Sequence, residues 1–318
     1  MNNTRTIRWI LYHEQIHLFI RTAKAFAEEI KQITNGRINV EVYTLEEYAE
    51  KFTDGVQYDP MTLIDHDKVE MSQVRTSLIG TWNCPDFFAL EMPYLFTDHD
   101  HATRVLDGAI GAEMLQSIEG NTPVRGLAFT YSGGYRVLAT DRPVHTAEEL
   151  SGLKLITTPN PVMVETLQHF GCEAVPYMIR DLQGKSELAD NAGYSVETTL
   201  PRYEHEANVD VQKYIADTEH SMYLTSIIIS KNFWASLSTE DQAAIQEAAR
   251  KAAVLEREWS VQEAEEFSQD HAKHAELGVT YISFDEVEKS KLREIVLPIY
   301  EKYAQMFTDN LLDKIIKS

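Results

Sequence analysis

The residues best placed for chemistry are a tyrosine, a histidine and a glutamate that are consecutive in the chain, Tyr12, His13 and Glu14. They follow Ile7 to Leu11, a short apolar run that predicts a buried strand. An imidazole beside a carboxylate could act as general base and acid, and the same groups could instead hydrogen-bond a polyol or an amine. Position alone does not separate the two hypotheses, and the residues by themselves favour ligand binding over catalysis.

Two histidine-containing stretches are candidates for metal ligands. Asp98-His99-Asp100-His101 offers four potential ligands, but consecutive residues of a short polar loop rarely converge on one ion. His271 and His274 would share one face of a long helix, and their charged neighbours favour a solvated face. No HExxH motif accompanies them. We therefore expect no metal site.

The signatures of the common enzyme classes are missing from the sequence. There is no GxSxG, no Walker loop and no GxGxxG, so motifs support neither a catalytic residue nor a cofactor. Cys84 and Cys172 lack CxxC spacing and encode neither a zinc module nor a disulfide framework, although one bridge between them is conceivable.

The elements that would position Tyr12 to Glu14 form a β-α-β unit. After the first strand comes a helix whose apolar face carries Phe19, Thr22, Phe26, Ile30 and Ile33. Asn35-Gly36 should end that helix, and Arg37 to Tyr43 alternates as a strand does. A right-handed crossover makes the two strands parallel, and ligands bind at the carboxyl ends of such strands. Tyr12 to Glu14 therefore lie at a candidate cleft.

A second α/β unit is expected further along the chain. Val124 to Phe129 should be a strand that meets a Gly-rich turn at Ser132-Gly133-Gly134 and returns through Tyr135 to Ala139, as a segment crossing between lobes. The following elements are a short helix from Thr146 to Gly152, a strand from Lys154 to Thr157, a helix from Pro161 to Phe170, a long lobe-spanning helix from Gln242 to Gln269 capped at Ser238, and an amphipathic helical C-terminal segment from Val287 to Ile316. That last segment would permit pairing of two copies, but a monomer is the default.

Composition narrows the choice of partner. The 318 residues suffice for two lobes, and a formal charge of -21 makes nucleic acid and anionic lipid poor partners. The longest apolar runs, such as Met222 to Ile229, are far shorter than the roughly 18 residues that a bilayer span needs. Met1 to Arg8 lack the apolar region of a secretory signal, so either a signal was removed or the protein stays inside the cell.

Three separated motifs resemble those of the solute-binding proteins of TRAP (tripartite ATP-independent periplasmic) transporters, of the DctP type. The segment Ala25 to Ile38 resembles that family's FAxxVxxxTxGxIxV, and Ala89 to Phe96 resembles its VLDLPFLF. Gly134-Tyr135-Arg136, followed by Arg142-Pro143-Val144 and Glu149 to Lys154, is similar to GxR, KPI and DLKGLKIR. The matches occur in the family's order and span nearly the whole chain.

The resemblance implies a ligand clamp, but this sequence departs from it. An arginine after Gly-Leu-Lys pairs with the ligand carboxylate in the family, and here that place holds Ile156. Arg136 matches a second family arginine, and Arg75 follows a predicted strand, so either could be a relocated anchor; structural ion pairs are the alternative for both. The family's DGxEN resembles Tyr194 to Thr198, with threonine replacing the ligand-contacting asparagine.

The resemblance implies an α/β, two-lobed periplasmic-binding-protein-like fold with a hinge and a long lobe-spanning helix. Lobe I would be residues 1–124 and about 210–250, lobe II residues 125–209 with part of the C-terminal region, and helices of 251–318 would pack across both. The chain would be a periplasmic binding protein, not an enzyme, that captures a small polar or acidic solute for TRAP membrane permease subunits. Its expected ligand contacts are Tyr12, His13, Glu14, Gln73, Arg75, Thr76, Arg136, Ile156, Thr158, Asn160, Glu197 and Thr198. The alternatives are a cytoplasmic enzyme or sensor on the same fold and, less well supported, a structural interaction module.

Overall fold

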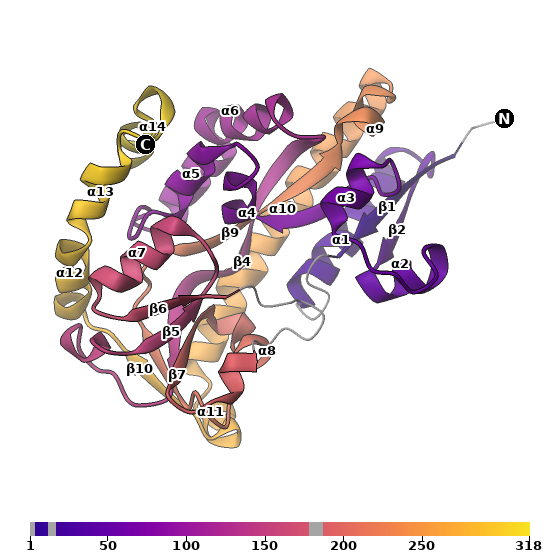
Figure 1. The fold of residues 1–318 in the computed structure, drawn as a ribbon. Coiled ribbons are helices and arrows are strands. Elements are labelled where there is room, and N and C mark those ends of the chain that lie inside the picture. Colours follow the sequence, from indigo (N-terminus) through magenta and orange to yellow (C-terminus); the bar gives the residue numbers. More distant parts are fainter. Residues whose placement is uncertain (1–3, 12–16, 178–186) are drawn as a thin grey trace.

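Two α/β lobes share one long strand and one long helix in the computed structural model, which describes residues 4–11, 17–177 and 187–318 (Figure 1). The strand order is β2-β1-β3-β9-β4-β7-β5-β6, and β8 joins β10 to the second half of β4. The strands are β1 Arg5–Ile10, β2 Ile38–Tyr43, β3 Met71–Arg75, β4 Val124–Thr140, β5 Lys154–Thr157, β6 Glu173–Pro176, β7 Tyr194–Thr199, β8 Tyr214–Asp217, β9 Met222–Ser230 and β10 Thr280–Ser283.

The first lobe confirms the predicted β-α-β unit. β1 is parallel to β2 and β3, and α1 (His17–Ile33) buries the predicted apolar residues except Ile33, which is 38% exposed on the last turn. Asn35 and Gly36 end the helix with φ angles of 49° and 75°, as the pair predicts. The other helices before β4 are α2 Leu45–Phe52, α3 Pro60–Asp65, α4 Thr76–Gly80, η1 Pro85–Glu91, α5 His99–Asp107, α6 Ala109–Ser117 and η2 Ile118–Gly120.

The second lobe contains the predicted strand β5 and helix α7 (Pro161–His169). β5 is parallel to β6 and β7, and β4 runs antiparallel to β7 and β8. The segment after Thr146 forms a single 3-10 turn, η3 Glu148–Leu150. The short elements between β6 and the long helix that follows β9 are η4 Glu187–Asp190, η5 Leu200–Arg202, α8 Tyr203–Glu206 and α9 Lys231–Ala235.

The predicted glycine-rich turn is wrong, because β4 continues through it as one 17-residue strand. Gly133 and Gly134 have φ angles of 95° and 79°, and the pairing of β4 with β9 shifts register between Tyr131 and Tyr135. The two glycines therefore form a bulge that redirects the strand from one sheet into the other. The prediction that this segment crosses between lobes stands.

The predicted long helix is present as α10 (Thr239–Gln269). The Ser238 hydroxyl accepts a hydrogen bond from the Asp241 N–H, as a cap should. The helix packs on α1 in the first lobe, along β4, and on η5 in the second lobe. Its alanines and Ile245 share an apolar core with Phe26 and Trp9, so one rigid element spans both lobes (Figure 1).

Two expectations for the C-terminal region need correction. The last segment is not one continuous helix but α12 Glu286–Ile295, α13 Leu297–Tyr303, η6 Thr308–Asn310 and α14 Leu311–Ile316, and the left-handed backbone of Asp309 and Asn310 precedes α14. His274 lies on α11 (His271–Leu277) and is 7% exposed, with Nε2 at 2.7 Å from the Phe267 carbonyl, so it is not on a solvated face. Cys84 and Cys172 are both free.

Candidate functional site

A buried group of polar side chains gathers around Arg136, where the carboxyl ends of β3, β5 and β7 meet β4. Parallel strands present such ends to ligands in open α/β sheets. Arg136 lies on β4 just after the bulge and is 1% exposed. We define the Arg136 cluster as Thr76, Glu91, Arg136, Thr157, Asn160, Glu197 and His220.

Two carboxylates flank the Arg136 guanidinium. Its Nη2 lies 3.1 Å from Glu91 Oε2 and its Nη1 lies 3.5 Å from Glu197 Oε2. The Asn160 side-chain amide donates to Glu91 at 3.0 Å, and the Thr76 hydroxyl donates to it at 2.7 Å. The carbonyl oxygen of Asn160 also caps α7. One side chain therefore fixes the start of a helix and orients a buried carboxylate.

The two glutamates respond differently to their surroundings. Burial raises the pKa of Glu91, and the Arg136 charge opposes this without reversing it. Burial also tends to raise the pKa of Glu197, but Arg136 and hydrogen bonds from His220 and Thr157 hold it below its usual value. His220 Nε2 lies 3.1 Å from Glu197 Oε1. Glu197 is therefore the more firmly ionised partner of Arg136.

A second arginine lies close by, in a group we name the Arg202 cluster: Ser132, Thr198, Arg202, Glu206 and Tyr223. Arg202 forms an ion pair with Glu206 and donates to the Ser132 hydroxyl, and Thr198 donates to Glu206 at 2.7 Å. The guanidinium carbons of Arg136 and Arg202 lie 4.0 and 4.4 Å from the centroid of the Tyr223 ring. The Tyr223 ring therefore attracts both guanidinium groups.

The structure brings together part of the predicted site. Thr76, Arg136, Asn160 and Glu197 converge in the Arg136 cluster, and Thr198 belongs to the Arg202 cluster. Arg75 ends β3 and is 7% exposed, and its charge acts on Glu91. Tyr12, His13 and Glu14 lie outside the described residues.

Three predicted contacts have other surroundings. Ile156 is 1% exposed and packs in an apolar cluster with Val137 and Val196. The Gln73 amide donates to Glu256 on α10 at 2.8 and 2.9 Å. The Thr158 hydroxyl is buried and has no hydrogen-bond partner among the described residues.

Sequence reasoning missed four residues of the two clusters that have a carboxylate, guanidinium or imidazole side chain: Glu91, Arg202, Glu206 and His220. Glu91 gave a usable signal, since it is an acidic residue inside the apolar stretch Phe87 to Phe96. The other three sit in polar sequence, where a buried residue looks like an exposed one.

The candidate metal stretch has structural roles instead. The Asp98 carboxylate caps α5 by accepting from the His101 N–H at 2.7 Å, and His101 Nε2 lies 2.8 Å from the Ile315 carbonyl. No group of three metal-ligating side chains occurs in the described part of the chain. Within the same residues, no helix has the length and apolar character needed to cross a bilayer.

Two α/β lobes with buried charged side chains gathered where they meet define a solute-binding protein of the periplasmic type. The chain belongs to the DctP family, the bacterial extracellular solute-binding proteins of family 7, whose match covers residues 12–306. This is a family of binding proteins and not of enzymes, which confirms the interpretation from sequence and disfavours the enzyme alternative.

Relatives and solved structures agree with this assignment. A solute-binding protein of Chromohalobacter salexigens is 27% identical over 291 residues, 90% of this chain and 80% of the relative. The sialic acid-binding periplasmic protein SiaP of Vibrio cholerae is 26% identical, covering 92% of this chain and 87% of its own length. A TRAP periplasmic solute-binding protein from Polaromonas sp. JS666, bound to D-erythronate, superposes with a TM-score of 0.83 at 22% identity over 98% of both chains.

Proposed function

We propose that this chain is the extracytoplasmic subunit of a TRAP transporter and that it captures a small hydroxylated organic acid between its lobes for delivery to the membrane permease. The observation that carries the proposal is the Arg136 cluster, which joins Glu91, Arg136 and Asn160 from three separate parts of the chain into one buried polar centre. Relatives with the same fold bind D-erythronate, galactonate and sialic acid. Fractionation of the producing cells tests the location: recovery in the cytoplasm would contradict it.

The lobes of this proposal are residues 1–124 with a returning segment of about 210–250, and residues 125–209 with part of the C-terminal region. The helices of 251–318 would pack across both. Because β8 pairs with β10 and with the second half of β4, whereas β9 pairs with β3, we move the start of the returning segment from about residue 210 to the connection between Asp217 and Met222. The hinge would then consist of this connection and the β4 bulge.

The solute would contact Arg75, Thr158 and Thr198, with Tyr12, His13 and Glu14 completing the site from the first lobe. Ile156 can supply packing but no charge, so the carboxylate of the solute needs another cation. Arg75 is our first candidate, because it stands at the carboxyl end of β3. Arg136 already has two carboxylate partners, Glu91 and Glu197. We expect it to act on the solute indirectly, by holding Thr76, Asn160 and Glu197 in position.

Calorimetric titration of the purified chain with D-erythronate, galactonate and succinate tests capture. We expect Arg75→Ala to weaken binding of the best acid at least about tenfold, since a charge-assisted hydrogen bond contributes about 1.5–3 kcal/mol. Arg136→Ala should also weaken binding of the acid, because the other residues of the Arg136 cluster would lose their positions. The exposed Arg250, which pairs with Glu247, is the matched control. Unchanged affinity in both variants would contradict the hypothesis that an arginine anchors the carboxylate. Failure of all three acids to bind would contradict the proposed class of ligand.

A further inference from the structure

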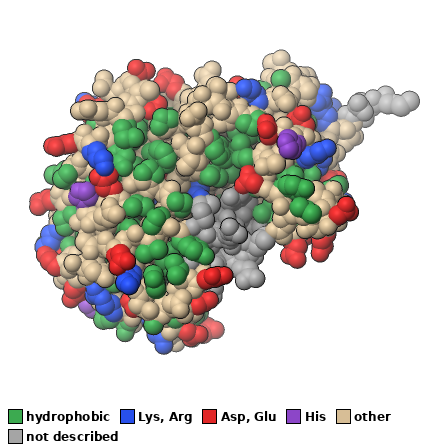
Figure 2. Space-filling model, in the orientation of Figure 1, with side chains coloured by type: hydrophobic (Ala, Val, Ile, Leu, Met, Phe, Trp, Pro, Cys, Tyr) green, Lys and Arg blue, Asp and Glu red, His purple; other side chains and the backbone are tan. Residues whose placement is uncertain are grey.

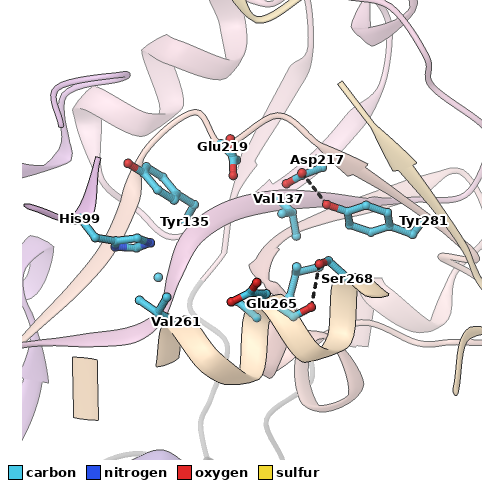
Figure 3. A pocket seen from close by; sticks show the side chains of 12 residues that line it. His99, Tyr135, Val137, Asp217, Glu219, Val261, Glu265, Ser268 and Tyr281 are labelled. Atoms are coloured by element: carbon cyan, nitrogen blue, oxygen red, sulfur yellow. Dashed lines mark hydrogen bonds between the residues drawn. The ribbon is translucent and has the colours of Figure 1, made fainter. Parts of the chain in front are cut away.

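A cavity lies apart from both arginine clusters, at the place where the lobe-connecting segments meet (Figure 3). Its volume is about 290 Å³, at the lower end for small-molecule pockets. The walls come from the β4 bulge at Gly134 and Tyr135, from Asp217 at the end of β8, from Glu219 in the connection to β9, and from α10. No residue of the Arg136 cluster lines it.

The pocket is strongly acidic. Figure 3 shows Asp217 and Glu219 on one side and Glu265, from α10, on the other. Lys289 pairs with Glu219, and it is the one cation of the described chain that pairs with any of the three carboxylates. Glu219 holds its position with a left-handed backbone, φ 47°, which is uncommon for a residue other than glycine. Local charge alone would attract any cation.

Hydrogen bonding makes the preference more specific. Each hydroxyl of the lining already donates within the protein: Tyr281 to Asp217, Tyr135 to the Phe96 carbonyl, and Ser268 to the Glu265 carbonyl. The His99 Nδ1 atom is buried and has no partner among the described residues, and a neutral imidazole can offer this nitrogen as an acceptor. The lining therefore offers more hydrogen-bond acceptors than donors, because its hydroxyl groups already donate within the protein. A ligand rich in N–H groups would match this arrangement.

Aromatic rings complete the walls. The His99 and Tyr135 rings lie 5.1 Å apart between centroids, and Tyr281 closes the opposite end beside Asp217 (Figure 3). Ring faces attract cations, and Val137, Val261 and Ala264 provide apolar surface between the charged ends. We propose that this pocket is a second binding site, for a small linear diamine whose two ammonium groups reach the carboxylates of opposite walls.

Occupancy would act on the conformation of the whole chain. A diamine in this pocket would touch β4, the connection from β8 to β9, and α10, all of which pass between the lobes. A ligand that fits one arrangement of these segments stabilises that arrangement. We therefore expect bound diamine to slow hydrogen exchange of the backbone amides of residues 132–137 and 217–221.

Calorimetry of the full chain with 1,4-diaminobutane, in the absence of any organic acid, tests the proposal. We expect saturable binding, and at least tenfold weaker binding of 1,4-butanediol, which has the same length but no charge. Choline, a cation without N–H groups, should also bind more weakly. Comparable affinity for all three compounds, or no diamine binding, would overturn the proposal and would leave capture of acids between the lobes untouched.

Three variants distinguish binding in this pocket from nonspecific attraction of a cation to an acidic protein. Glu265→Gln should weaken diamine binding about tenfold, whereas Glu258→Gln, which removes one exposed charge from the same helix, should leave it unchanged. Ala264→Leu keeps every charge and fills part of the cavity, so it should abolish binding. Equal loss in the Glu265 and Glu258 variants, or full binding by the Ala264 variant, would contradict the assignment.

Discussion

Glu256 is the side chain whose protonation bears most directly on stability. It lies on α10, is fully buried and accepts two hydrogen bonds from the Gln73 amide. Burial raises its pKa to about 8, and the hydrogen bonds from Thr22 and Gln73 oppose this only in part. The carboxyl group is therefore protonated in the folded chain at neutral pH, where an unfolded chain would release the proton.

The expected consequence is a loss of stability as pH rises. Between the ordinary glutamate pKa of about 4.3 and the folded value, the folded state binds one more proton, so this group lowers the unfolding free energy by up to about 1.4 kcal/mol per pH unit. Glu256→Gln keeps an acceptor for Gln73 and does not titrate. In urea unfolding, the free energy of unfolding of the Glu256→Gln variant minus that of the parent should increase from about pH 5 to about pH 8 and then level off. A difference that stays constant across this range would refute the assignment; Glu258→Gln is the control.

At the scale of the elements, β4 depends strongly on one position, Gly133. A Cβ atom at Gly133 would lie 2.2 Å from the Thr199 hydroxyl, and its φ of 95° disfavours every L-residue. Gly133→Ala should cost at least about 2 kcal/mol of unfolding free energy, through backbone strain and displacement of β7. Gly120→Ala, whose Cβ would meet nothing within 4 Å, should change stability by less than about 0.5 kcal/mol. Equal effects in urea unfolding would contradict the close approach of β4 and β7.

Elements with a strong local pattern could be predicted from sequence. α1 and β2 have an apolar periodicity, α10 follows the capping residue Ser238, and Pro161 and Gly171 mark the two ends of α7. These elements and β5 occur within a few residues of the expected bounds. The bulge in β4 could not be predicted, because Gly-Gly favours a turn and only pairing with β9 and β7 keeps the strand extended. The site divides in the same way: Arg136 and Glu197 belong to recognisable motifs, whereas Arg202 and His220 are buried by distant segments.

At the scale of the whole molecule, the buried apolar side chains of the described residues form three cores. One core joins α1 with the first part of α10, one lies under β7 and β8 in the second lobe, and the largest extends from η1 to the C-terminal helices. On the visible face of the molecule, acidic side chains are scattered mainly along the edges, between patches of hydrophobic side chains (Figure 2). The largest core includes residues of both lobes, such as Val74 and Leu155, so the lobes meet through apolar packing as well as through the ion pairs of the Arg136 cluster.

Capture between lobes predicts two linked changes when the preferred acid binds. At a free concentration 100 times its dissociation constant, the unfolding free energy should rise by about 2.7 kcal/mol, because the ligand binds only the folded chain. The radius of gyration from X-ray scattering should fall if the β4 bulge and the segment before β9 act as a hinge. A stability gain with an unchanged radius would mean that the lobes are already closed before binding. In that case the solute must enter through local opening, and its association rate should be far below the usual 10⁵–10⁷ M⁻¹s⁻¹.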